Sequence, residues 1–123
     1  MSVRLVVAED TEHLRRMLVD ILQLHGFAVV AEARTLAEVL RSVEETEPDV
    51  LVIGHRPQGI DGIEATVRIR AHRPNLEVIL YAAPLDRQIE GLARDAGARC
   101  IPRTAGVEAL AREISAIMLL LDR

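Results

Sequence analysis

The chain has 123 residues and a formal net charge of −4, with 50% hydrophobic, 28% charged and 2% aromatic residues. This composition predicts one globular domain, residues 1–123, with an aliphatic core, and it weighs against direct nucleic-acid binding, which uses basic stripes or stacked rings. All 15 residues counted as lysine or arginine are arginines, which excludes lysine chemistry, and the single cysteine, Cys100, excludes an internal disulfide.

No run of the sequence approaches the roughly 20 apolar residues of a membrane helix. The first residues also lack the pattern of a signal peptide. We therefore expect a cytoplasmic protein with no membrane contact.

Short aliphatic runs alternate with amphipathic patterns along the first half of the chain. Residues 3–8 predict a strand, and apolar residues at helical spacing then predict a helix that ends near Gly26. Residues 27–31 predict a second strand. Thr35 and Glu38 have the spacing of a capping box and predict the start of a second helix.

The second half continues the alternation. Residues 49–53 predict a third strand, apolar nearly throughout, as expected where helices cover both faces of a sheet, and residues 54–62 predict a loop. The remaining predicted elements are a helix that begins near Ile63 and ends at Pro74, a strand over 76–81, a helix that ends at Gly97, a short strand over 99–101 and a final helix over 107–121.

Five successive strand–helix units predict a doubly wound α/β fold. We expect a parallel sheet in the order 2-1-3-4-5 inside a flavodoxin-like three-layer sandwich. Ligands of such sheets bind beyond the carboxyl ends of the strands where the order reverses, here between the first and third strands. The residues expected on this rim are Glu9, Asp10, Gly54, Ala82 and Arg103.

These segments resemble the receiver domain of bacterial two-component response regulators, over essentially the whole chain. The resemblance implies a signalling module that acts through protein contacts and is not an enzyme. Its partners would be an effector domain, a histidine kinase or another regulator. The segments that carry the resemblance are Val6–Asp10, Pro48–Ile53, Pro57–Thr66, Ala96–Ala98 and Pro102–Arg103.

The chain departs from the family pattern at the residues that carry its chemistry. The resemblance implies a phosphoacceptor aspartate where this chain has Gly54, a hydroxyl residue at Ala82 and a lysine at Arg103, so only the acid pair of Glu9 and Asp10 is kept. We expect a receiver-like module without phosphorylation or a required cofactor, and at most weak Mg²⁺ binding by the acid pair. Arg103 is expected to enter the vacated space and pair with either acid.

Residues 117–121 form an apolar run at the end of the final helix. A helix cannot bury five consecutive residues on one side, so we expect a contact surface there, made by Ile117, Met118, Leu120 and Leu121. The alternative is fraying of apolar residues at a terminus. The resemblance implies dimers through the fourth helix, fifth strand and fifth helix.

Other interpretations are open for several residues. The acid pair can be a solvated acidic loop, and Asp61 is expected to cap a helix. His55 is expected to be a solvated loop residue and not a substitute phosphoacceptor. The main alternative function is a small-molecule-binding regulatory module, because Gly54 leaves room at the strand-order reversal. An enzyme is disfavoured, since the three serines lie away from strand ends and the four histidines lack metal-ligand spacing.

Overall fold

The computed structural model describes residues 2–121, without the side chain of Leu121. A parallel five-stranded sheet in the order β2-β1-β3-β4-β5 forms its centre, which confirms the predicted flavodoxin-like fold. The strands are β1 (Arg4–Ala8), β2 (Ala28–Ala33), β3 (Val50–His55), β4 (Glu77–Ala82) and β5 (Arg99–Pro102).

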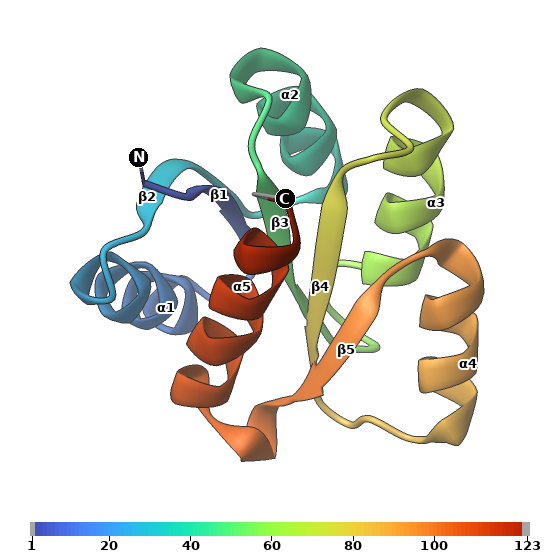
Figure 1. Ribbon diagram of the computed structural model, residues 1–123. Helices are drawn as coiled ribbons and strands as arrows, with labels where there is room; N and C mark the ends of the chain where they lie inside the picture. The colour runs from blue at the N-terminus through green and yellow to red at the C-terminus, as the bar shows by residue number, and fades with distance from the viewer. Residues whose placement is uncertain (1, 122–123) are drawn as a thin grey trace.

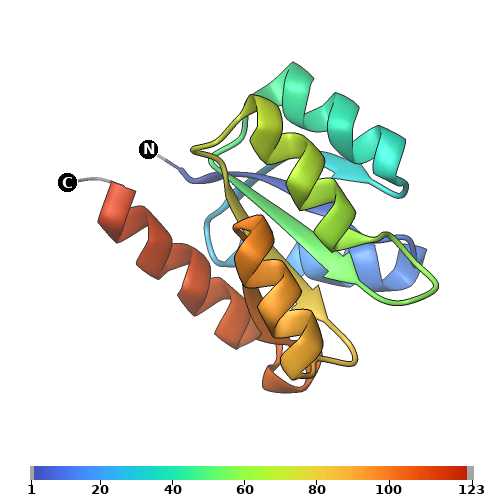
Figure 2. The same cartoon turned by 90° about the vertical axis from the view of Figure 1, so that its right-hand side faces the viewer.

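Helices cover both faces of the sheet (Figure 1, Figure 2). Helices α1 and α5 pack on one face and α2, α3 and α4 on the other. Within residues 2–121, no helix is long and apolar enough to cross a membrane. The helices are α1 (Glu12–Leu24), α2 (Leu36–Thr46), α3 (Gly62–His72), α4 (Arg87–Ala96) and α5 (Val107–Leu121), with a short 3₁₀ helix, η1 (Arg103–Ala105), before α5.

The interior strand β1 illustrates why the strands of this sheet are rich in apolar residues. Val6 and Ala8 belong to the core beneath α2 and α3, whereas Leu5 and Val7 belong to the core beneath α1 and α5. Successive side chains of a strand point to opposite faces, so a strand covered on both sides needs apolar residues throughout. This double core holds the carboxyl ends of β1 and β3 in place, where the site lies.

Side-chain caps start two helices close to the predicted positions. The Thr35 hydroxyl accepts a hydrogen bond from the Glu38 amide at 3.2 Å, but the Glu38 carboxylate accepts from the Arg34 amide at 2.9 Å and not from Thr35. The second hydrogen bond of the capping box therefore comes from the amide of Arg34, one residue before Thr35. Asp61 accepts from the amides of Ile63 and Glu64 and caps α3, as predicted.

β3 runs two residues further than the predicted strand. Gly54 and His55 stay in the ladder, with Tyr81 and Ala82 of β4 as their partners. The prediction that Gly54 begins a loop is wrong, because pairing with a neighbouring strand outweighs the low strand propensity of glycine. As a result, Gly54 and His55 lie on β3 at the carboxyl edge of the sheet.

Ile117 is not a surface residue. It is 1% exposed and packs in the core beneath α1 and α5, so its assignment to a contact surface is wrong. The reason is helical periodicity, since Ile117 shares a face with Leu110 and Ile114 at spacings of three and four residues.

The remaining residues of the apolar run differ in exposure. Leu119 is 71% exposed and Leu120 is 57% exposed, whereas Met118 is half-buried. The side chain of Leu121 lies outside the described part of the structure. An apolar surface at the end of α5 is therefore centred on Leu119 and Leu120.

Replacement of Ile117 by alanine should lower the free energy of unfolding by about 2–5 kcal/mol, because it leaves a cavity in the core. The matched variant Leu119→Ala removes an exposed side chain and should change the free energy by no more than about 0.5 kcal/mol. Urea unfolding of both variants measures the contrast, and equal losses would contradict this placement of the two side chains.

Candidate functional site

The candidate site lies at the carboxyl ends of β1 and β3, where the strand order reverses. Glu9 and Asp10 follow β1, Gly54 lies near the end of β3 and Arg103 begins η1 after β5. The structure brings Glu9, Gly54 and Arg103 into one cluster, since a side chain at position 54 would meet both of the other two. Asp10 lies beside this cluster but has a different partner, Arg56.

The carboxylate of Glu9 is fully buried and forms an ion pair with the guanidinium of Arg103. Its Oε1 accepts from Arg103 Nη2, and its Oε2 accepts from the backbone amide of Thr11 at 2.8 Å. A buried charge is tolerated only when it is paired and its other lone pairs are satisfied. Removing Arg103 would leave an uncompensated charge, which costs about 3–5 kcal/mol in comparable cases.

Tyr81 of β4 holds Arg103 at two points. The guanidinium carbon lies 5.3 Å from the centre of the Tyr81 ring, and the Tyr81 hydroxyl donates to the Arg103 carbonyl oxygen at 3.3 Å. Burial raises the pKa of the Tyr81 hydroxyl, although the charge of Arg103 opposes this, so the hydroxyl stays a donor. The sheet therefore fixes both the backbone and the side chain of Arg103.

Gly54 provides the space that this ion pair occupies. A Cβ at position 54 would clash with Glu9 Oε1 and lie 2.6 Å from Arg103 Nη2. Arg103 enters the space beside Gly54 and pairs with Glu9, as expected, so the room that the small-molecule alternative needs there is filled. Ala82 ends β4 opposite His55 and brings only a methyl group to this edge.

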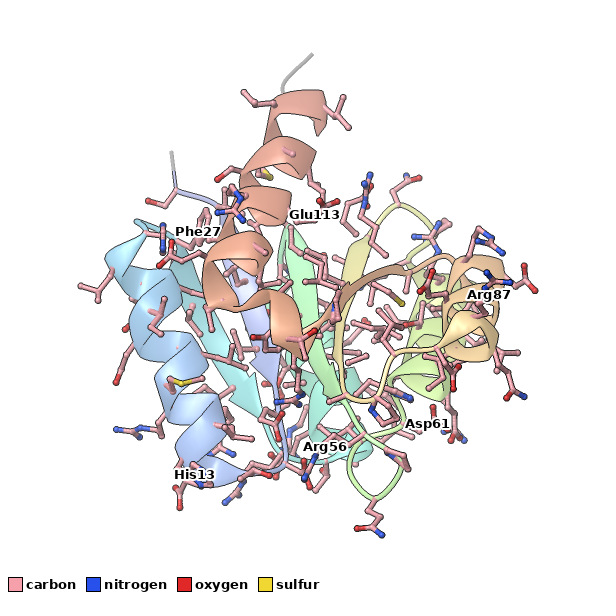
Figure 3. All side chains as sticks on the ribbon, turned by 90° about the horizontal axis from the view of Figure 1, so that it is seen from below. His13, Phe27, Arg56, Asp61, Arg87 and Glu113 are labelled. Atoms are coloured by element: carbon pink, nitrogen blue, oxygen red, sulfur yellow. The ribbon has the colours of Figure 1, made fainter. Side chains whose placement is uncertain are left out.

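Arg56, in the loop between β3 and α3, is the partner of Asp10. Its Nη2 lies 2.8 Å from both carboxylate oxygens of Asp10 and 2.9 Å from the hydroxyl of Thr11. In Figure 3 Arg56 lies between His13 at the start of α1 and Asp61 at the start of α3. Burial alone would raise the pKa of Asp10, but the hydrogen bond and charge of Arg56 outweigh it and lower that pKa.

No pattern in the sequence indicated Arg56 as a residue of the site. The residue lies two positions beyond Gly54, in a loop that the predicted topology places beside the acid pair. A basic residue in that loop was the available signal. It was not decisive, because a loop arginine can equally point to solvent.

The acid pair does not fit a divalent cation in this arrangement. Magnesium needs nearly octahedral coordination by oxygen ligands. All four carboxylate oxygens of Glu9 and Asp10 already accept hydrogen bonds, from Arg103, Thr11 and Arg56. Among residues 2–121, no three histidine, cysteine, aspartate or glutamate side chains are grouped as a metal site would require.

His55 links the end of β3 to the start of α3. It is buried, and its Nδ1 accepts a hydrogen bond from the Gly62 amide at 3.0 Å. Burial lowers the pKa of the imidazole, with a smaller opposing effect from Asp61. The expectation of a solvated loop histidine is wrong, because β3 extends through this position and turns the side chain inward.

A hollow of about 420 Å³ adjoins the acid pair on its outer side, between Asp10, Leu36 and Ile60. Neither Gly54 nor the ion pair of Glu9 with Arg103 lines it. The room that a small molecule would need therefore does not lie at Gly54.

Comparisons of the sequence give consistent relatives. The family model described as "Response regulator receiver domain" matches residues 5–114. A protein-glutamate methylesterase/protein-glutamine glutaminase of Haloarcula marismortui is 41% identical over 81 residues, which cover 66% of this chain but only 22% of that relative. Chemotaxis protein CheY of Listeria monocytogenes is 31% identical over 80 residues, which cover 65% of this chain and 67% of that relative.

Solved structures show the same fold. The signal receiver domain of the response regulator NarL from Mycobacterium tuberculosis has a TM-score of 0.87 at 26% identity, covering 94% of this chain and 95% of that one. A two-component response regulator of the LuxR family from Aurantimonas sp. SI85-9A1 has a TM-score of 0.90 at 27% identity, covering 97% of this chain and 86% of that one.

Replacement of Gly54 by alanine should lower the free energy of unfolding by about 1–3 kcal/mol, because the added methyl group overpacks a buried ion pair. The matched variant is Gly91→Ala in α4, where a Cβ would meet nothing closer than Arg94 Nη2 at 3.9 Å. That variant should raise stability by about 0.5–1 kcal/mol. Denaturant unfolding measures both changes, and a stabilised Gly54→Ala protein would refute the packing described here.

The buried His55 should make the protein less stable in mild acid. Its pKa is lowered in the folded state, so the unfolded state takes up the proton first as the pH falls through about 6.5. His55→Asn keeps an acceptor near the Nδ1 position and should lose less stability between pH 8 and pH 5.5. Parallel pH profiles for the parent and the variant would contradict this assignment.

Proposed function

The chain belongs to the response regulator receiver domain family, and on that premise we propose that residues 1–123 form a receiver-like signalling module that works without phosphorylation. The observation that carries the proposal is the buried ion pair of Glu9 with Arg103, which lies where a side chain at position 54 would lie. A glycine at that position has no nucleophile. The residues around it leave no room for one.

The chemistry of phosphoryl transfer supports the same conclusion. Transfer to a receiver needs a carboxylate nucleophile, a divalent cation held by acidic oxygens and donors for the transferred group. Gly54 lacks the first, and the oxygens of Glu9 and Asp10 are engaged by arginines and a backbone amide. Ala82 has no hydroxyl, and Arg103 is committed to Glu9. Each of the three requirements for phosphoryl transfer is therefore weakened or lost.

The two ion pairs hold three segments in one arrangement. Glu9 with Arg103 joins the end of β1 to η1, and Asp10 with Arg56 joins it to the loop between β3 and α3. We propose that the module presents one fixed surface to a protein partner, such as an effector domain, a histidine kinase or another regulator. The sequence relatives include chemotaxis and response-regulator proteins, in keeping with this role.

The site of partner contact is part of the proposal. Leu119 and Leu120 expose apolar surface at the end of α5, which is one of the elements through which we expect a second copy to bind. We place the protein in the cytoplasm and assign it no enzymatic activity of its own. A small-molecule function is not proposed, because the space beside Gly54 is filled.

Incubation with acetyl phosphate and Mg²⁺ should leave the intact mass of the protein unchanged, because no carboxylate is placed to accept the phosphoryl group. Mass spectrometry measures the adduct directly, with CheY of Listeria monocytogenes treated in parallel as the control for the reagents. A phosphoryl adduct on an aspartate of this chain would overturn the proposal.

A further inference from the structure

We propose that Arg56 is a built-in counter-cation of the acid pair, and that its guanidinium takes the place a divalent cation would need at Asp10. The inference rests on the proposed function and deepens it, because it concerns what regulates the same site. In the folded chain, the guanidinium groups of Arg103 and Arg56 balance the charges of Glu9 and Asp10. A soluble cation is then not needed.

The geometry at Asp10 is that of a charge held between several oxygens. One nitrogen, Arg56 Nη2, contacts both carboxylate oxygens at 2.8 Å and the Thr11 hydroxyl at 2.9 Å. These three oxygens converge on one point, and that point is occupied by the tip of the arginine. Close packing of the loop supports the placement, since a Cβ at Gly59 would lie 2.8 Å from Asp10 Oδ1.

Arg56 reaches this point at a cost to its own hydrogen bonding. Its Nε is buried and has no hydrogen-bond partner among the described residues. An unpaired buried donor is unfavourable, so the contacts made at Nη2 determine where the guanidinium lies. The side chain therefore points to Asp10 and Thr11 and does not extend along the surface.

The two acids differ in their access to solvent, which decides where a cation could enter. The carboxylate of Glu9 is fully buried and is neutralised by Arg103. The side chain of Asp10 is 29% exposed and that of Arg56 is 35% exposed, so solvent ions can reach this pair but not the buried Glu9. An arginine is always charged and is tethered to the fold, so it occupies the site whatever the ion concentration.

Terbium luminescence tests this inference, because Tb³⁺ binds oxygen ligands and is sensitised by a nearby tyrosine. Tyr81 is the only tyrosine, the chain has no tryptophan, and Tyr81 contacts Arg103 at the site. We would titrate Tb³⁺, with Mg²⁺ as competitor, into the parent chain, Arg56→Gln, and Arg56→Gln combined with Asp10→Asn. The matched control is Arg68→Gln, which removes an exposed ion pair with Glu64 of 2.9 Å on α3.

The parent chain and Arg68→Gln should give no saturable luminescence that Mg²⁺ displaces. Arg56→Gln should bind Tb³⁺ at least about tenfold more tightly than the parent chain. The Coulomb repulsion between a guanidinium and a divalent or trivalent ion a few ångströms away weakens binding by at least that factor even in water. The additional Asp10→Asn substitution should abolish the gain. Arg56→Lys, which keeps the positive charge, should still exclude the ion.

Either of two results would overturn the inference. One is saturable Tb³⁺ binding to the parent chain that Mg²⁺ displaces. The other is the lack of any gain in an Arg56→Gln protein whose circular dichroism and melting temperature show that it is folded. Neither result bears on phosphorylation, which the mass of the acetyl phosphate reaction decides separately. The parent titration needs no variant, so the inference is testable even if Arg56→Gln fails to fold.

Discussion

A carboxylate that is fully buried must have its charge met inside the protein, and Glu9 imposes this constraint on the whole site. Its partner, Arg103, lies in η1 after the edge strand β5, and Tyr81 contacts its guanidinium there. The pair fills the volume beside Gly54. A side chain at position 54 and this ion pair therefore exclude one another, because both would occupy the same space. The lack of a side chain at Gly54 and the position of Arg103 are therefore two parts of one packing arrangement.

The two acids that follow β1 have different roles despite their adjacent positions. Glu9 is buried and works as a structural charge, whereas Asp10 is partly exposed and ties the loop after β3 through Arg56. In both cases the carboxylate pairs with a guanidinium. The pair that the family resemblance presents as a ligand set is thus a clamp on three connecting segments.

The fold and the chemistry of this protein depend on different sets of residues. The backbone superposes closely on receiver domains of known structure, with TM-scores of 0.87 and 0.90. Glu9, Gly54 and Arg103 lie together at one edge of the sheet, and function depends on such sites more than on the fold that carries them. Even there the framework is ordered, since His55 ties β3 to the first residue of α3.

The alternation of strands and helices, the edge at which the site lies and the lack of a nucleophile at Gly54 could all be predicted from the sequence, because they follow from local periodicity and residue type. The pairing of each arginine with its acid, and the participation of Arg56, became visible only in the folded chain. Those pairs join residues 94 and 46 positions apart, so no local pattern encodes them. The inward turn of His55 and the burial of Ile117 likewise depend on a neighbouring strand and a neighbouring helix, which supply contacts that residue type alone does not reveal.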